Sequence, residues 1–134
     1  MKLASGILLQ AKDTGRLLFV LRNDKQPTWS FLGGGVEDGE TLLTCAKREL
    51  YEEAGFIADI HYTINSHDAI HITKRYAFEY HCFIGTTETE IVPKLNNEHL
   101  DYKWANLEDI EHKHFGIVDL LSDEHALDII KKGS

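Results

Sequence analysis

Two apolar runs open the chain, Leu3 to Gln10 and Arg16 to Leu21, and the polar stretch Lys12 to Gly15 separates them. Short apolar runs bounded by turn residues are typical of buried β-strands. The connection has the length of a hairpin, so the pattern predicts an antiparallel pair. Trp29 to Leu32 predicts a further short strand. The first run is too short to cross a membrane and no small-residue cleavage site follows it, so we interpret it as a strand and not as an export signal.

From Thr41 the hydrophobic spacing becomes helical. Leu43, Ala46, Leu50 and Ala54 recur at intervals of three and four residues, which places them on one face of a helix. No glycine or proline interrupts this run before Gly55, so the helix is predicted to end there.

The second half of the chain alternates between strand-like and polar stretches. We predict strands at Ile57 to Asn65, Arg75 to Gly85 and His99 to Ala105, loops at Ser66 to Thr73 and Thr86 to Asn97, a short turn at Asn106 to Ile110, and one C-terminal helix from Phe115 to Lys132. This order predicts the α/β class, as a three-layer α/β/α sandwich around a mixed sheet with the C-terminal helix opposite the first one. Residues 1–134 are expected to form a single domain.

Composition limits the binding partners and the cellular compartment that we expect for this protein. With 22 acidic against 14 basic residues the formal charge is −8, which argues against an extended grip on nucleic acid or an anionic membrane. Cys45 and Cys82 belong to no C-x-x-C pair, so we interpret both as reduced thiols and expect the protein in the cytoplasm.

The predicted helix carries a group of acids on one side. Glu49, Glu52 and Glu53 fall within an arc of about 100°, beside the apolar stripe. Like charges at these spacings destabilise a helix by roughly 0.2–0.5 kcal/mol per pair, so a positive partner is expected. Arg48 can offset one of these charges.

A bound cation would offset the remaining charge. Glu37 and Glu40 in the preceding loop add two more acids, and a hard divalent ion with oxygen ligands suits such a set better than one guanidinium does. The alternative is an ordinary solvated, charged helix face.

The glycines in front of the helix change this balance, because they allow the backbone to approach a ligand without a Cβ in the way. The segment reads G-x5-E-x7-R-E-U-x-E-E-x-G-U, where U is bulky, and so resembles the Nudix box. The matching residues are Gly34, Glu40, Arg48, Glu49, Leu50, Glu52, Glu53, Gly55 and Phe56. The resemblance implies a Nudix-type α/β/α sandwich and a pyrophosphohydrolase that cleaves nucleoside diphosphates linked to another moiety, with Mg²⁺ or Mn²⁺ as cofactor.

The resemblance also assigns metal ligands and a general base. It makes Glu49, Glu52 and Glu53 the ligands, and Glu37 a further ligand, directly or through water. The late segment E-H-x-x-Y-x-W is similar to the region where a loop glutamate approaches the metals in this family, which makes Glu98 a catalytic candidate. Either Glu49 or Glu98 would deprotonate the nucleophilic water; the alternative for Glu98 is a solvated loop acid.

Other residues would support catalysis or hold the substrate. Arg48 and Glu40 are predicted to fix the glycine loop on the helix through a charge-assisted bond. Gly34 and Gly35 would allow close approach of the substrate. Arg22, at the end of the second strand, is either a phosphate contact or a solvated strand-end arginine.

Histidine is abundant but is not predicted to bind metal. None of the eight histidines lies in an H-E-x-x-H or cysteine-rich pattern. We expect His67, His71, His112 and His114 to be solvated or singly hydrogen-bonded.

Three functional hypotheses follow. The first is hydrolysis of a nucleoside diphosphate derivative, namely a nucleotide sugar, a dinucleoside polyphosphate or a (d)NTP; the second is a non-catalytic Nudix-like module that binds a nucleotide; the third is a structural acidic helix. Retention of every carboxylate of the box favours the first. The small-molecule substrate stays undetermined at this level, as does the oligomeric state, for which a homodimer is one alternative.

Overall fold

Strand β1 (Lys2–Ala11) is the centre of an eight-stranded mixed sheet in the computed structural model, which describes residues 1–134. It pairs in parallel with β7 (Phe78–Thr87) along its whole length. Its other edge is shared, because β4 (Leu32–Gly35) pairs antiparallel with its first half and β2 (Leu17–Arg22) begins opposite its end. The predicted antiparallel pair of the first two strands is confirmed.

The remaining strands extend the sheet from β2 and β7. Strands β3 (Trp29–Ser30) and β8 (His99–Ala105) both pair with β2. Strands β5 (Thr63–Ile64) and β6 (His71–Arg75) pair with opposite ends of β7. All of these pairings are antiparallel, so the β1–β7 pair alone makes the sheet mixed.

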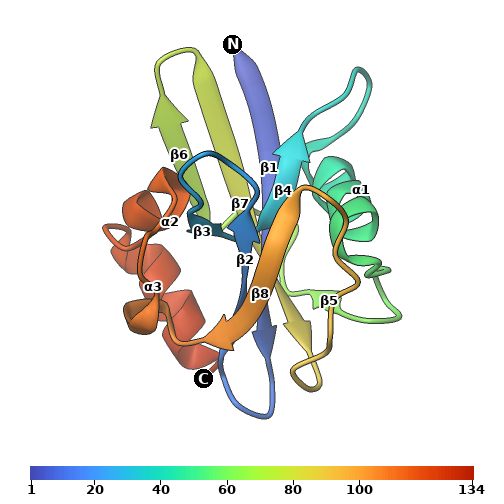
Figure 1. Cartoon of the computed structure of the whole chain (residues 1–134), viewed down its shortest axis with the longest axis vertical. Coiled ribbons are helices and arrows are strands. Elements are labelled where there is room, and N and C mark those ends of the chain that lie inside the picture. The colour runs from blue at the N-terminus through green and yellow to red at the C-terminus, as the bar shows by residue number, and fades with distance from the viewer.

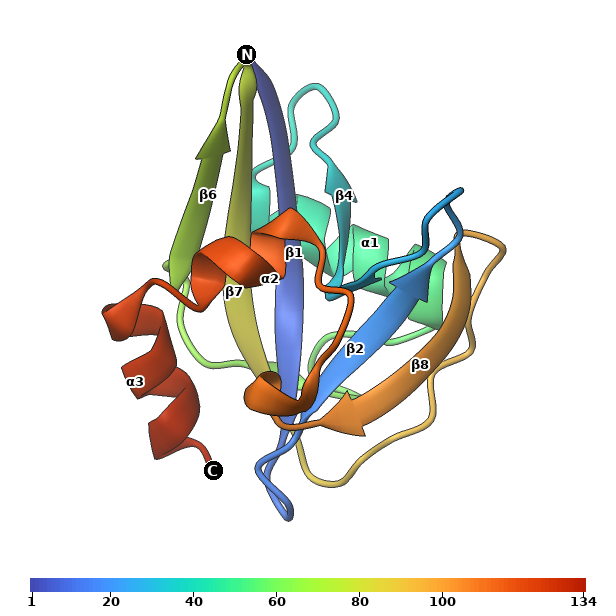
Figure 2. The same ribbon diagram turned by 60° about the vertical axis from the view of Figure 1, so that its left-hand side comes forward.

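Helices cover both faces of this sheet (Figures 1 and 2). Helix α1 (Leu42–Ala54) lies on one face, and η1 (Leu107–Asp109), α2 (Phe115–Leu120) and α3 (Glu124–Lys132) lie on the other. The predicted three-layer α/β/α architecture is confirmed.

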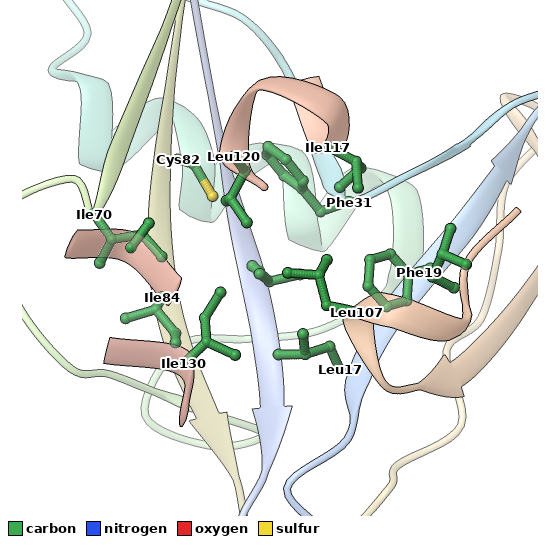
Figure 3. Packing of buried hydrophobic residues seen from close by; sticks show 13 residues of the cluster. Leu17, Phe19, Phe31, Ile70, Cys82, Ile84, Leu107, Ile117, Leu120 and Ile130 are labelled. Carbon is green, nitrogen blue, oxygen red and sulfur yellow. The ribbon is translucent and has the colours of Figure 1, made fainter. Parts of the chain in front are cut away.

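The strands supply a hydrophobic core to each face because their side chains alternate. In β1, Ile7 and Leu9 pack under α1, whereas Leu8 packs under the C-terminal helices. Figure 3 shows the second of these clusters, where Ile117 of α2 and Ile130 of α3 meet residues of the sheet.

Local signals fix both ends of α1. The Thr41 side chain caps the start by accepting a hydrogen bond from the Thr44 backbone N–H at 3.1 Å. Gly55 ends the helix in the left-handed conformation, with φ of 73°. The predicted limits of this helix are confirmed.

The predictions for Ile57 to Gly85 were wrong in three places. Within Ile57 to Asn65 only β5 is a strand, and the expected loop Ser66 to Thr73 contains the start of β6. Arg75 to Gly85 is not one strand either, because the chain turns at Ala77, whose φ is 59°. The sequence gives no signal for this turn, because alanine rarely adopts positive φ and is not a typical turn residue.

The C-terminal helix was also predicted wrongly as one piece. It breaks between α2 and α3, where the Asp123 side chain caps α3 by accepting from the Ala126 backbone N–H at 3.1 Å. The same carboxylate binds His71 Nδ1 of β6 at 2.7 Å. This contact between distant segments favours the break, whereas the apolar spacing continues across it.

The two cysteines are free and buried. Burial raises the pKa of both thiols, Cys45 and Cys82, so both are protonated at neutral pH. No helix of the structure has the length and the apolar character needed to cross a bilayer.

The cap at Gly55 leads to a stability prediction. Gly55→Ala forces a Cβ into the left-handed conformation, although the nearest neighbour, Lys94 Cβ, would be 3.6 Å away. We expect the free energy of unfolding in urea to fall by about 1–2 kcal/mol. Gly35→Ala is the control, because its φ is not positive and a Cβ there would meet nothing within 4 Å. An equal effect of the two substitutions would contradict this explanation.

Candidate active site

Two carboxylates of α1 lie on its buried face, beneath β4. Glu49 and Glu53 are one turn apart and only 9% and 3% exposed. The Gly33 backbone N–H donates to Glu53 Oε1 at 2.9 Å. A Cβ on Gly34 would lie 2.5 Å from the Glu49 carboxyl carbon, so a larger residue there would displace that carboxylate from its present position. The glycines of β4 therefore leave room for the two carboxylates beneath the strand, and they also leave the strand backbone open to a ligand.

A third carboxylate reaches this pair from a distant loop. Glu98 lies just before β8, and ligand oxygens of Glu49, Glu53 and Glu98 all fall within 4.8 Å of one another. We call these three residues the carboxylate cluster. The structure thus brings together two residues of the box and the loop glutamate that the sequence suggested separately.

Arg48 contacts four acids of the box and its loop, but not Glu53. Its guanidinium binds Glu40 at 2.6 Å, Glu49 at 2.9 Å and Glu52 at 3.1 Å, and it lies 3.5 Å from Glu37. Its single positive charge can nevertheless offset only one of these four negative charges.

The Arg48 guanidinium also joins the glycine strand to the helix. Its Nη2 donates to the Gly35 carbonyl at 3.0 Å and to Glu40 Oε1 at 3.0 Å. Glu40 in turn accepts from the Glu37 backbone N–H at 3.0 Å. This geometry is the one expected of residues that fix the loop on the helix.

Glu37 and Glu52 lie outside the carboxylate cluster. Their side chains are 68% and 50% exposed, and both face Arg48. Their assignment as metal ligands stays a prediction, as do the roles assigned to the other site residues.

Electrostatics separate the acids of the box into two kinds. Burial, together with the charges of Glu49 and Glu98, raises the pKa of Glu53 to about 9. Burial also raises the pKa of Glu49, although Arg48 opposes the shift. In contrast, hydrogen bonds from Arg48 lower the pKa of Glu40 to about 2. Arg48 stabilises Glu40 as an anion, while Glu53 has no comparable cation beside it.

The carboxylate cluster has the donor set of a divalent metal site. It offers oxygen ligands only, which suits a hard cation such as Mg²⁺ or Mn²⁺. The raised pKa of Glu53 indicates that the protein alone does not compensate the buried charge. The residues present therefore fit a divalent cation.

His99 is a site residue that our sequence analysis missed. Its side chain is 7% exposed, and its Nε2 lies 3.8 Å from Glu53 Oε2. Its Nδ1 is buried without a hydrogen-bond partner, and burial lowers its pKa, which favours the neutral imidazole. The one signal in the sequence was its position directly after Glu98.

Of the histidines expected to be solvated or singly bonded, His71 differs and His114 agrees. His71 binds both Asp123 and Thr73, the latter at 3.1 Å through Nε2. His114 caps α2 by accepting from the Gly116 backbone N–H at 3.2 Å, and burial lowers its pKa to about 4. The His71 ring therefore links β6 to the start of α3, and the His114 ring caps the start of α2.

A cavity of about 490 Å³ opens over Glu53 and Glu98 of the cluster. Arg22 lines this cavity and binds Asp24 at 2.8 Å through Nε, so its terminal nitrogens keep no protein partner. Lys2 lines it as well and forms no ion pair. The other lining residues are Asn23, Asp24, Ser30, Phe31, Gly33, Gly34, Gly35, Tyr80 and His99.

An adjoining cavity of about 310 Å³ shares Lys2 and Arg22 with the first one and has an aromatic wall. The rings of Phe78 and Phe115 meet edge to face with centroids 6.0 Å apart. The His114 ring lies 4.1 Å from Phe115. Such a wall offers π-faces to a flat heterocycle, and the two cations line this cavity as well as the one over the carboxylates.

The family model of the NUDIX domain matches residues 2–121. The chain belongs to the Nudix family. It is a pyrophosphohydrolase by its relatives, and Nudix hydrolases generally use divalent metal ions.

Known relatives of this Nudix chain act on different phosphoanhydrides. Dihydroneopterin triphosphate diphosphatase of Escherichia coli is 31% identical over 115 residues, which cover 75% of each chain. RNA pyrophosphohydrolase of Bartonella bacilliformis is 33% identical over 102 residues, covering 60% of this chain and 58% of the relative. The structure of a C. elegans Ap4A hydrolase has a TM-score of 0.73 at 23% identity and covers 96% of each chain, which shows the shared fold.

The buried acid gives a prediction for pH dependence. Glu53 has a folded pKa of about 9 against about 4.3 for an unperturbed glutamate, so the native state holds its proton more tightly than the unfolded state does. The contribution of Glu53 to the free energy of unfolding is therefore fully present below about pH 4.3 and is lost as the pH rises through about 9. In EDTA, Glu53→Gln should melt higher than the parent protein, by on the order of 5 °C at pH 8.5, and the two should agree near pH 4.5.

The matched control for this measurement is Glu52→Gln, a residue on the same helix with a half-exposed side chain. Its melting temperature should follow that of the parent protein at every pH. Parallel pH curves for Glu53→Gln and the parent would show that burial does not perturb Glu53.

Proposed function

We propose that this Nudix protein hydrolyses a phosphoanhydride bond in a di- or triphosphate derivative of a heterocyclic nucleoside or related compound, by metal-dependent attack of water at phosphorus. The observation that carries the proposal is the carboxylate cluster, which adjoins a cavity lined by Lys2 and Arg22 and an aromatic wall. The relatives named above, which act on dihydroneopterin triphosphate and RNA pyrophosphate, support the same class.

The proposed ligands are Glu49 and Glu53, with Glu52, Glu37 and Glu98 as further candidates. When bound, Mg²⁺ or Mn²⁺ would neutralise charge on the transferring phosphoryl group and lower the pKa of a water molecule. The chain's own contribution is to hold Glu49 and Glu53 buried beneath β4 and to bring Glu98 within reach of them.

Two glutamates are candidates for taking the proton of the attacking water. Glu98 is exposed to the cavity, and its carboxylate binds one amide group only. Glu49 accepts a hydrogen bond from Arg48, which weakens it as a base, although burial raises its pKa. Both stay candidates until their variants are compared.

The cations and the aromatic wall support the choice of substrate. Arg22 and Lys2 can bind the non-reacting phosphates, because Lys2 forms no ion pair and Arg22 binds Asp24 through Nε alone, which leaves its terminal nitrogens able to donate. Phe115 and Phe78 can pack against a base or pterin ring. Nucleotide sugars and dinucleoside polyphosphates contain the same heterocycle and phosphates and stay within the proposed class.

A non-catalytic nucleotide-binding module is the second candidate. The same cavities would hold a nucleotide without cleavage, so binding alone does not separate the two functions. Turnover does.

The first test is a screen for products. Incubated with Mg²⁺ or Mn²⁺ and a panel of nucleoside triphosphates, dihydroneopterin triphosphate, nucleotide sugars and dinucleoside polyphosphates, the protein should release pyrophosphate, phosphate or a nucleotide from at least one. EDTA should abolish the reaction, and added Mg²⁺ should restore it, because the ligand set is anionic oxygen. Binding of a nucleotide without turnover under any of these conditions would favour the binding module.

The second test separates the two candidate bases. At saturating metal, Glu98→Gln should lower the single-turnover rate by roughly 10²–10⁴-fold while KM changes little, if Glu98 takes the proton. Glu49→Gln measured beside it should then lose less in the chemical step. Saturation matters because a metal-binding defect can imitate the loss of a base. A parent-like rate for Glu98→Gln would remove Glu98 and leave Glu49.

A further inference from the structure

Asn96 caps the C-terminal end of α1 from a distant loop. The last carbonyls of a helix have no partner within it. Here the Asn96 backbone N–H donates to the Glu53 carbonyl at 3.2 Å, and its side-chain Nδ2 donates to the Glu52 carbonyl at 3.1 Å. The Lys94 N–H likewise donates to the Ala54 carbonyl at 2.9 Å. The loop before β8 is therefore bound to the helical turn that carries Glu53.

The same Asn96 side chain holds Glu98. Its Nδ2 donates to Glu98 Oε2 at 3.2 Å, and its Oδ1 accepts from the Glu98 backbone N–H at 3.0 Å. The amide can take only this orientation, because the reverse would place its oxygen against two acceptors. Both N–H groups of the amide are thus used, one on α1 and one on Glu98.

No other hydrogen bond orients the Glu98 carboxylate. Asn23 attaches the same loop from the other side, through its N–H to the Glu98 carbonyl and its Nδ2 to the Asn97 carbonyl, both at 3.0 Å. These contacts hold the backbone alone. The position of the carboxylate relative to the helix depends on Asn96.

We propose that Asn96 is a positioning residue that sets the Glu98 carboxylate against Glu53 by linking both to the end of α1. The inference rests on the proposed function, in which Glu98 acts at the reacting phosphate. Asn96 itself lines neither cavity of the site. It acts through Glu98.

The direct test is Asn96→Asp, which keeps the shape and the acceptor for the Glu98 N–H. Its second oxygen would face the Glu52 carbonyl and the Glu98 carboxylate, so the carboxylate should turn away. At saturating Mg²⁺ we expect kcat to fall roughly 10–100-fold with KM within about threefold, as for loss of an interaction made in the transition state. Asn97→Asp adds the same charge at the exposed neighbour, whose side chain makes no hydrogen bond, and should stay within about twofold of the parent.

A double-mutant cycle separates positioning from simple capping. If Asn96 acts through Glu98, Asn96→Asp should have little further effect on kcat in the Glu98→Gln background. If it merely caps the helix, the melting temperature should fall and kcat should drop by the same factor in both backgrounds. That second result would overturn the proposal.

Hydrogen exchange gives a readout that needs neither metal nor substrate. In the metal-free protein, the Glu98 backbone N–H should exchange at least about tenfold faster in Asn96→Ala than in the parent, and Asn97→Ala should not change it. Unchanged exchange would overturn the proposal. Absence of turnover in the parent would refute the proposed function instead, and the exchange result would still decide whether Asn96 holds Glu98.

Discussion

Two carboxylates buried one turn apart beneath a glycine strand are the constraint on which the rest of this site depends. Glu49 and Glu53 lie on the face of α1 that packs against the sheet, where apolar residues would be the ordinary choice. The absence of a Cβ at Gly34 leaves room for the Glu49 carboxylate, and the Gly33 N–H donates to Glu53. Buried charge is costly unless it is compensated, and a bound cation supplies that compensation.

Arg48 divides the acids of the site into compensated and uncompensated groups. It neutralises Glu40 and joins it to the glycine strand, so contacts within the protein hold the loop on the helix. Glu53 and Glu98 receive no such partner. A structural acidic helix would not need this asymmetry, because salt bridges on a solvated face would serve every carboxylate alike.

The sheet explains why distant segments meet at one cavity. Pairing of β2 with β8 brings Arg22 opposite His99, next to Glu98. Pairing of β1 with β7 brings Lys2 opposite Phe78, where the aromatic wall begins. Carboxylates, cations and aromatic rings therefore come from separate elements, and each element is held by backbone hydrogen bonds that are independent of the ligand.

The sequence by itself determined the parts that depend on local patterns. Helix α1 was predicted with both ends because Thr41 and Gly55 are local caps, and the box was recognisable because its residues lie within one loop and one helix. Alternating and apolar runs predicted β1 and β2 for the same reason.

Only the tertiary structure decided the rest, because it depends on contacts between residues far apart in the chain. Asp123 breaks the C-terminal helix while it binds His71 across 52 positions, and the turn at Ala77 forms because β6 pairs with β7. The burial of His99 and the capping of α1 by Asn96 across 44 positions follow from the fold alone. Hydrophobic periodicity reports which face of an element is buried, but it carries no information on which distant polar group will meet it there.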